Sequence, residues 1–180
     1  MIAGSAFCGQ CLKRRMDERD GMNMDKIEMS GLYIIKDQYF RDYPSEKYMD
    51  NKGGTRPHFY AVQDARGLYW MIPISSKVEK FRAKIKMIEE KSGEGSCFLY
   101  AITEIAGRER ALVIAEMFPV TLAYIERAYT VKGIPYVVRN RETQKVISQK
   151  AFRFLSMLEH GRVKSPVNAL LTREKLCRTP

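Results

Sequence analysis

No long apolar run occurs in this sequence of 180 residues. The longest stretch without a charged residue is residues 1–12, whereas a membrane-spanning helix needs roughly 18 consecutive apolar residues or more. A secretory signal places positive charge before its apolar stretch, but here Lys13, Arg14 and Arg15 follow the weakly apolar opening. We therefore expect no transmembrane segment and a cytoplasmic location.

Cysteine and histidine are scarce, with 4 Cys and 2 His in the chain. So few cysteines do not make a disulfide scaffold, and reduced thiols are expected. Cys8 and Cys11 form a C-x-x-C pair, but a structural zinc ion needs four ligands, and no second close pair or nearby histidine completes the set. Walker, dinucleotide-binding, H-E-x-x-H and G-x-S-x-G patterns are absent too. We expect no metal and no cofactor.

Positive charge is in excess, with 31 Lys and Arg against 21 Asp and Glu. The excess is local: residues 77–91 contain 6 basic and 3 acidic residues, and residues 139–180 contain 10 and 3. Localised basic segments attract polyanions. Nucleic acid is therefore the first partner to consider, and a solvated basic helix without a ligand is the alternative.

Five short apolar runs separated by turn residues predict β-strands: residues 31–36, 58–63, 68–74, 97–105 and 110–115. The second and third runs flank the turn at 64–67, and the fourth and fifth flank the turn at 106–108, so each pair predicts a hairpin. Residues 42–56 are polar and turn-rich, and they predict a long loop.

Apolar residues recur at helical spacing in residues 77–90 and again in residues 147–158, before Gly161. Ser165 and Pro166 suit the start of a final helix. Together, these elements predict an α+β domain on a small, curved, largely antiparallel sheet, with an inserted helix and C-terminal helices. We expect one domain at residues 26–180, after an irregular extension at residues 1–25.

The most informative residues lie where the third predicted strand meets the basic helix. This strand ends in Ser75, Ser76 and Lys77. Ser76 and Glu79 fit a capping box, which would account for Ser76 without any function. The same helix start, with its free amides and dipole, is equally suited to bind a phosphate. Both interpretations stay open.

RNA supplies a specific chemistry for such a site. Lys77, Lys80 and Lys84 lie three and four residues apart, so they could contact successive phosphates from one side of the helix. An RNA phosphodiester carries its own nucleophile, the 2′-hydroxyl. Its cleavage therefore needs alignment, proton transfer and stabilisation of the developing charge, but no metal.

The two histidines, His58 and His160, could form an acid–base pair near neutral pH. His160 stands just before Gly161, where a cationic side chain favours a helix end, so capping accounts for it. His58 follows Arg56 and Pro57 at a loop-to-strand junction, and it is the better functional candidate. A buried structural histidine is the alternative.

Aromatic residues are frequent near the N-terminal end of the predicted domain: Tyr33, Tyr39, Phe40, Tyr43 and Tyr48. Aromatic rings can stack on single-stranded bases, and we select Tyr33 as a candidate RNA contact. Packing in the core or against loops is the alternative for all of these rings.

Residues 72–77, Ile-Pro-Ile-Ser-Ser-Lys, resemble the ToxN/AbiQ family of bacterial type III toxin–antitoxin endoribonucleases, which includes the CptN and TenpN branches. The order of segments also agrees: Tyr-Ile-Ile at 33–35, Arg-Pro-His-Phe-Tyr at 56–60, Val-Ile-Ala-Glu-Met-Phe-Pro-Val at 113–120, and a helical end around 149–154. The resemblance covers residues 30–176.

The resemblance implies a barrel-like core similar to the MazF and Kid toxins, and RNA cleavage that leaves a 2′,3′-cyclic phosphate. It also implies a role in phage defence, a cellular mRNA substrate and an RNA antitoxin. In this family the antitoxin consists of pseudoknot repeats, which the toxin cuts from a precursor and binds in closed toxin–RNA complexes.

Residue by residue, the family's hydroxyl pair corresponds to Ser75 and Ser76, and its nearby lysine to Lys77. In ToxN a proline precedes that lysine, so Val78 takes the ungapped position. His58 stands where ToxN carries a lysine. The catalytic candidates are therefore Ser75, Ser76, Lys77 and His58, and the RNA-binding candidates are Arg56, Lys80, Lys84, Arg153 and Tyr33. A non-catalytic RNA-binding module and a MazF-like toxin with a protein antitoxin remain as alternatives.

Overall fold

The computed structural model describes residues 27–48 and 50–178. The extension predicted for residues 1–25, including Cys8 and Cys11, lies outside them. In chain order the elements are β1 (Leu32–Ile35), α1 (Asp37–Asp42), β2 (Pro57–Gln63), β3 (Tyr69–Ser75), α2 (Val78–Ser92), β4 (Ala101–Ile105), β5 (Arg108–Leu112), β6 (Phe118–Val120), β7 (Ile125–Ala128), β8 (Thr130–Val131), β9 (Ile134–Pro135), α3 (Arg141–Glu159) and α4 (Ala169–Arg178). Two 3-10 turns, η1 (Ile114–Glu116) and η2 (Leu122–Tyr124), flank β6.

One antiparallel sheet organises the chain, in the order β4-β5-β3-β2-β1-β7. β3 is central, because β2 pairs with one of its edges while β5 and β6 share the other. β5 pairs with Ile74 and Ser75, and β6 pairs with the opposite end of β3, so η1 lies between two pairings on the same edge. The predicted α+β class with an antiparallel sheet is confirmed.

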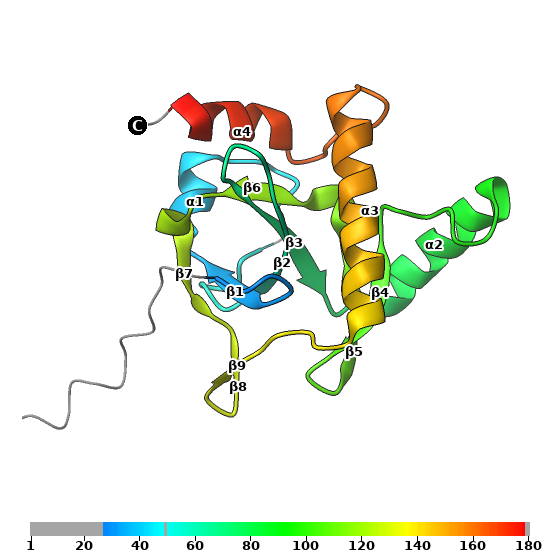
Figure 1. Ribbon diagram of the computed structural model, residues 1–180, viewed down its shortest axis with the longest axis horizontal. Coiled ribbons are helices and arrows are strands. Elements are labelled where there is room, and N and C mark those ends of the chain that lie inside the picture. Colours follow the sequence, from blue (N-terminus) through cyan, green and yellow to red (C-terminus); the bar gives the residue numbers. More distant parts are fainter. Residues whose placement is uncertain (1–26, 49, 179–180) are drawn as a thin grey trace, which may run out of the picture.

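The helices cover the sheet unequally (Figure 1). α3 packs against β2 and η1, α4 packs against β6, and α2 packs against β4 and β5. The buried face of α3 consists of the residues that give its helical stripe: Ile147, Ala151, Phe154, Leu155 and Leu158. In α2 only Phe81 is buried, so this helix projects from the body of the protein with its basic surface exposed.

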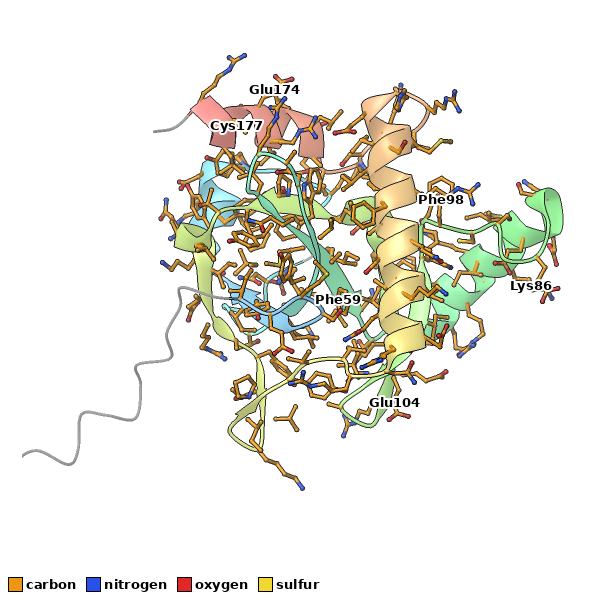
Figure 2. The ribbon with its side chains drawn as sticks, in the orientation of Figure 1. Phe59, Lys86, Phe98, Glu104, Glu174 and Cys177 are labelled. Atoms are coloured by element: carbon orange, nitrogen blue, oxygen red, sulfur yellow. The ribbon has the colours of Figure 1, made fainter. Side chains whose placement is uncertain are left out.

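The core fills the space between the sheet and its helices, where Figure 2 labels Phe59. Trp70, on the central strand, is fully buried, and its indole N–H donates to the Asp64 carboxylate at 3.0 Å. The same carboxylate accepts the backbone N–H groups of Arg66 and Leu68, at 2.9 and 3.0 Å. Asp64 therefore ties the predicted turn at 64–67 to the core, and it aligns β2 with β3.

Several boundaries differ from the predictions. The short helix α1 was not predicted, β4 begins at Ala101 rather than at residue 97, and residues 113–115 leave the strand and enter η1. The last helix begins at Ala169, because Asn168 has a left-handed φ of 53° that a helix cannot accommodate. Ser165 still caps this start by accepting the Ala169 N–H at 3.2 Å.

Candidate active site

A groove of about 910 Å³ lies beside the junction of β3 and α2. Five of the residues singled out from the sequence line it: Arg56, Ser75, Ser76, Lys77 and Lys80. It also contains charged residues that the sequence analysis did not select, namely Lys47, Asp50, Lys52, Arg108, Arg110 and Glu116. The groove therefore joins residues from five separate parts of the chain into one predominantly basic surface.

The two serines differ in what they do. Ser75 is buried at the end of β3, and its hydroxyl accepts the backbone N–H of Lys77 at 3.2 Å, which fixes the turn into α2. Ser76 is exposed in the groove. The Ser75 hydroxyl, at the end of β3, thus fixes the backbone, whereas the Ser76 hydroxyl, in the next residue, lies in the groove.

The capping box considered for the start of α2 does not form. The cap position is Lys77, and no side chain among the described residues makes a capping hydrogen bond there. Glu79 instead pairs with Arg82 on the exposed side of the helix, at 3.3 Å. The first amides of a 15-residue helix therefore stand beside Ser76 and the groove without a side-chain cap.

Arg56 is held rigidly next to this junction. Its Nη1 donates to the Ile74 carbonyl at 2.8 Å, and its Nε donates to the Asp50 carbonyl at 2.5 Å. Partial burial lowers the pKa of Arg56, although the carboxylates of Asp50 and Glu116 oppose this shift. A fixed guanidinium therefore lies at the β2 side of the groove.

Lysines of α2 extend the positive surface. Lys80 lines the groove and lies 5.8 Å from the centre of the Phe81 ring. Lys84 lies over the rings of Phe81 and Tyr100, at 5.4 and 5.3 Å, outside the groove lining but close enough to act electrostatically on Glu116. The structure thus places Lys77 and Lys80 in the groove and Lys84 at its border.

Glu116, at the end of η1, is one of two acidic residues of the groove lining that the sequence analysis missed, and Asp50 is the other. Burial raises the pKa of its carboxyl group, and the positive charges of Lys84, Lys80 and Arg56 act in the opposite direction. A signal was present, because Glu116 is the single charged residue in the otherwise apolar segment 111–120. Nothing in the sequence linked this residue to the serine–lysine junction, because that link depends on the sheet.

His58 does not line the groove. The side chain is only 2% exposed, and its ring packs against Phe118 and Phe40, with centroids 5.3 and 6.1 Å apart. Burial, assisted by the charge of Arg56, lowers the pKa of His58 to about 3. The structure thus places His58 in the core and outside the groove lining, where the alternative of a buried structural histidine fits better than a role in RNA cleavage.

Tyr33 and Arg153 also lie outside the groove lining. Tyr33 is 6% exposed and its hydroxyl is engaged with the backbone of Glu28, so its ring is not available to stack on a base. Arg153 lies on the outer side of α3, with its guanidinium 4.8 Å from the centre of the Phe98 ring. Figure 2 shows Phe98 beside α3. Packing explains Tyr33, and Arg153 is separate from the groove.

His160 occupies the end of α3, as the sequence indicated, with Nδ1 2.7 Å from the carbonyl oxygen of Ser156.

Within residues 27–48 and 50–178, no group of three or more His, Cys, Asp or Glu side chains is arranged to hold a metal ion. In the same residues, no helix combines the length and apolar character needed to cross a bilayer.

The fold is similar to those of two solved structures, AbiQ and ToxN. AbiQ, a lactococcal anti-phage endoribonuclease belonging to the type III toxin–antitoxin system, is similar with a TM-score of 0.58 and 12% identity, over 82% of this chain and 96% of AbiQ. ToxN, from a bacterial antiviral system regulated by a processed non-coding RNA, is similar with a TM-score of 0.57 and 14% identity, over 81% of this chain and 96% of ToxN. No protein-family model and no curated protein sequence matches the chain.

Proposed function

We propose that this protein is an endoribonuclease toxin of a type III toxin–antitoxin system and that it cleaves RNA without a metal ion. The observation that carries the proposal is the groove, where two serines, an uncapped helix start and several cations meet. AbiQ, which shares the fold, is an anti-phage endoribonuclease of this type. Phage defence is accordingly the proposed biological role.

In the proposed complex, the scissile phosphate lies at the start of α2. The free amides there and the helix dipole favour an anion. The Ser76 hydroxyl and the Lys77 ammonium group donate to the non-bridging oxygens, while Ser75 keeps the turn in place through the Lys77 amide. Arg56 and Lys80 contact the same phosphate or its neighbour from the walls of the groove.

The reaction proposed for this site uses the ribose itself. The 2′-oxygen attacks the adjacent phosphorus, the bond from phosphorus to the 5′-oxygen breaks, and the products carry a 2′,3′-cyclic phosphate and a 5′-hydroxyl. Fixed cations stabilise the additional negative charge of the pentacoordinate state, and a preorganised groove supplies them without reorganisation. Rigid placement of Arg56 by two carbonyls fits this requirement.

The proposed partners are a cellular mRNA substrate and an RNA antitoxin made of pseudoknot repeats, bound in a closed toxin–RNA complex. The net charge of +10 and the basic groove support a polyanionic inhibitor. The relation to ToxN, from a system regulated by a processed non-coding RNA, supports the same class of inhibitor.

The test compares wild-type protein with Ser76→Ala and Lys77→Ala on a single-stranded transcript in EDTA. We expect the wild type to produce fragments with cyclic phosphate ends, and each variant to cleave at least about tenfold more slowly, since each loses a contact to the phosphate. Lys91→Ala is the matched control, because Lys91 is at the opposite end of α2 and outside the groove lining.

Thermal unfolding shows whether a variant that cleaves more slowly is still folded. Ser76 is exposed, so Ser76→Ala should retain the wild-type melting temperature. Ser75→Ala loses a buried hydrogen bond and should reduce the free energy of unfolding by about 1 kcal/mol. Intact RNA bound by the wild type would indicate a non-catalytic module, and a small acidic protein in the purified complex would indicate a protein antitoxin; either result would overturn the proposal.

A further inference from the structure

We propose that Glu116 is the general base that removes the proton from the attacking 2′-hydroxyl. This inference rests on the proposed function, because it assigns a role within that same groove. Three observations support it: the position of the carboxylate in the groove, the cations around it, and the lack of a hydrogen bond or salt bridge to its oxygens among the described residues.

The sheet places Glu116 across β3 from Arg56. Arg56 precedes β2, which pairs with one edge of β3, and it donates to Ile74 of that strand. Glu116 ends η1, which lies along the other edge, where Val113 donates to the carbonyl of Pro73 at 3.0 Å. Both residues line the same groove as Ser75 and Ser76. A phosphate at the start of α2 would thus have a carboxylate on one side and a guanidinium on the other.

This arrangement matches the geometry of an in-line displacement. The attacking and leaving oxygens stand on opposite sides of the phosphorus, so a base and a cation are needed on opposite sides too. The remaining acidic residue of the groove lining is Asp50, and its Oδ1 already accepts the backbone N–H of Lys52 at 2.9 Å. Glu116 is therefore the better placed carboxylate.

The Glu116 carboxylate is surrounded by positive charge but is not neutralised by a contact. Lys80 and Lys84 face it from α2, Arg56 faces it from the segment before β2, and Arg108 and Arg110 line the groove from β5. On α3, which packs against η1, Lys150 is engaged with the Tyr100 carbonyl at 3.1 Å.

The Glu116 backbone N–H donates to the carbonyl of Val113 at 3.0 Å, but among the described residues its carboxylate accepts no hydrogen bond and forms no salt bridge within 4.0 Å. A carboxylate that served only to hold these cations in place would form such contacts. No residue of the described part of the chain occupies the Glu116 carboxylate oxygens, so within that part they can face a ligand. Burial also raises the pKa of the carboxyl group despite the nearby cations, which makes the carboxylate a stronger base.

In the proposed step, a lone pair of the 2′-oxygen forms a bond to phosphorus while its proton moves to the Glu116 carboxylate. The bond from phosphorus to the 5′-oxygen breaks, and its electron pair leaves with that oxygen, which takes a proton from a groove lysine. Solvent then returns a proton to the lysine and accepts one from Glu116. The step needs no oxidant, reductant or further reactant.

The test measures single-turnover cleavage of a single-stranded transcript by wild type, Glu116→Gln and Glu116→Asp in EDTA over a range of pH. General bases contribute about 10²–10⁴-fold, so Glu116→Gln should cleave slower by this factor. The wild-type rate should rise with pH through the raised pKa of Glu116 and then level off. This rise should disappear in Glu116→Gln and persist in Glu116→Asp.

Binding is measured in parallel with a fully 2′-O-methylated RNA, which cannot react. Glu116→Gln removes a negative charge from a basic groove, so it should bind this RNA at least as tightly as the wild type. A purely structural role would weaken binding and cleavage together. The matched control is Glu94→Gln, in the exposed turn after α2, which should leave cleavage and binding unchanged.

The outcomes separate this inference from the proposed function. If the wild type cleaves RNA and Glu116→Gln cleaves at the same rate, or keeps the same dependence on pH, Glu116 is not the base although the groove is still the active site. If the wild type cleaves no RNA, and if Ser76→Ala binds the methylated RNA as tightly as the wild type does, the proposed function itself is wrong.

Discussion

His58 illustrates how one buried side chain can make the stability of a protein depend on pH. Its buried ring packs against Phe118 and Phe40, and the nearby charge of Arg56 further disfavours an imidazolium. The folded protein therefore holds this histidine neutral at a pH where the unfolded chain would protonate it. Arg56, fixed by Ile74 and Asp50, remains charged at the groove while His58 stays beneath it.

We predict that the free energy of unfolding decreases as the pH falls from about 6.5, the ordinary histidine pKa, towards 3. In this range the unfolded state binds a proton that the folded state does not, so the slope should approach about 1.4 kcal/mol per pH unit. Urea denaturation at several pH values measures it. His58→Gln should have a smaller slope, and an equal slope in both proteins would contradict the pKa assigned to His58.

Among the secondary-structure elements, helices α2 and α3 differ in how their N-termini are capped. α3 begins with Asn140, whose side chain accepts the Thr143 N–H at 2.9 Å. α2 begins at the groove with Lys77 in the cap position and without such a bond. At the start of α3 a side chain accepts a hydrogen bond from a helix amide. At the start of α2 no side chain caps the helix, so its first amides can bind an anion, as the proposed active site requires.

We predict opposite responses when the two starts are altered. Asn140→Ala should reduce the free energy of unfolding by about 1 kcal/mol, because it removes a helix cap. Glu79→Gln should leave stability unchanged, since Glu79 pairs with Arg82 at the surface and does not take part in a capping box. Chemical denaturation measures both variants. A loss with Glu79→Gln as large as that with Asn140→Ala would show that the capping box forms in solution.

In the whole molecule, folding brings together basic residues from segments that are far apart in the sequence. The groove contains Lys77 at the cap of α2 and Lys80 within this helix, but its other cations include Arg56 and two arginines of β5, Arg108 and Arg110. None of the basic residues in 139–178, such as Arg153 on α3, belongs to the groove lining. The surface proposed to bind RNA is therefore assembled mainly from segments with modest net charge.

We predict that Arg108→Ala and Arg110→Ala each weaken RNA binding and reduce its salt dependence. Each phosphate contact to single-stranded RNA contributes about 0.7 to the slope of log K against log salt, so each variant should lower the slope by about this amount. Titration of 2′-O-methylated RNA at several salt concentrations measures it. Arg141→Ala, at the start of α3, is the control, and an equal effect there would mean that charge acts without a defined groove.

Local sequence patterns were enough to predict the α+β class, the strand–turn–strand units and the serine–lysine junction, because these depend on periodicity and on neighbouring residues. Which side chains meet at that junction became known from the three-dimensional structure. It buried Tyr33 and His58, separated Arg153, and brought Glu116 to the groove through the pairing of β3 with strands later in the chain. Residue spacing along a strand or helix is local, whereas burial and charge clustering arise from contacts between segments that are far apart in the sequence.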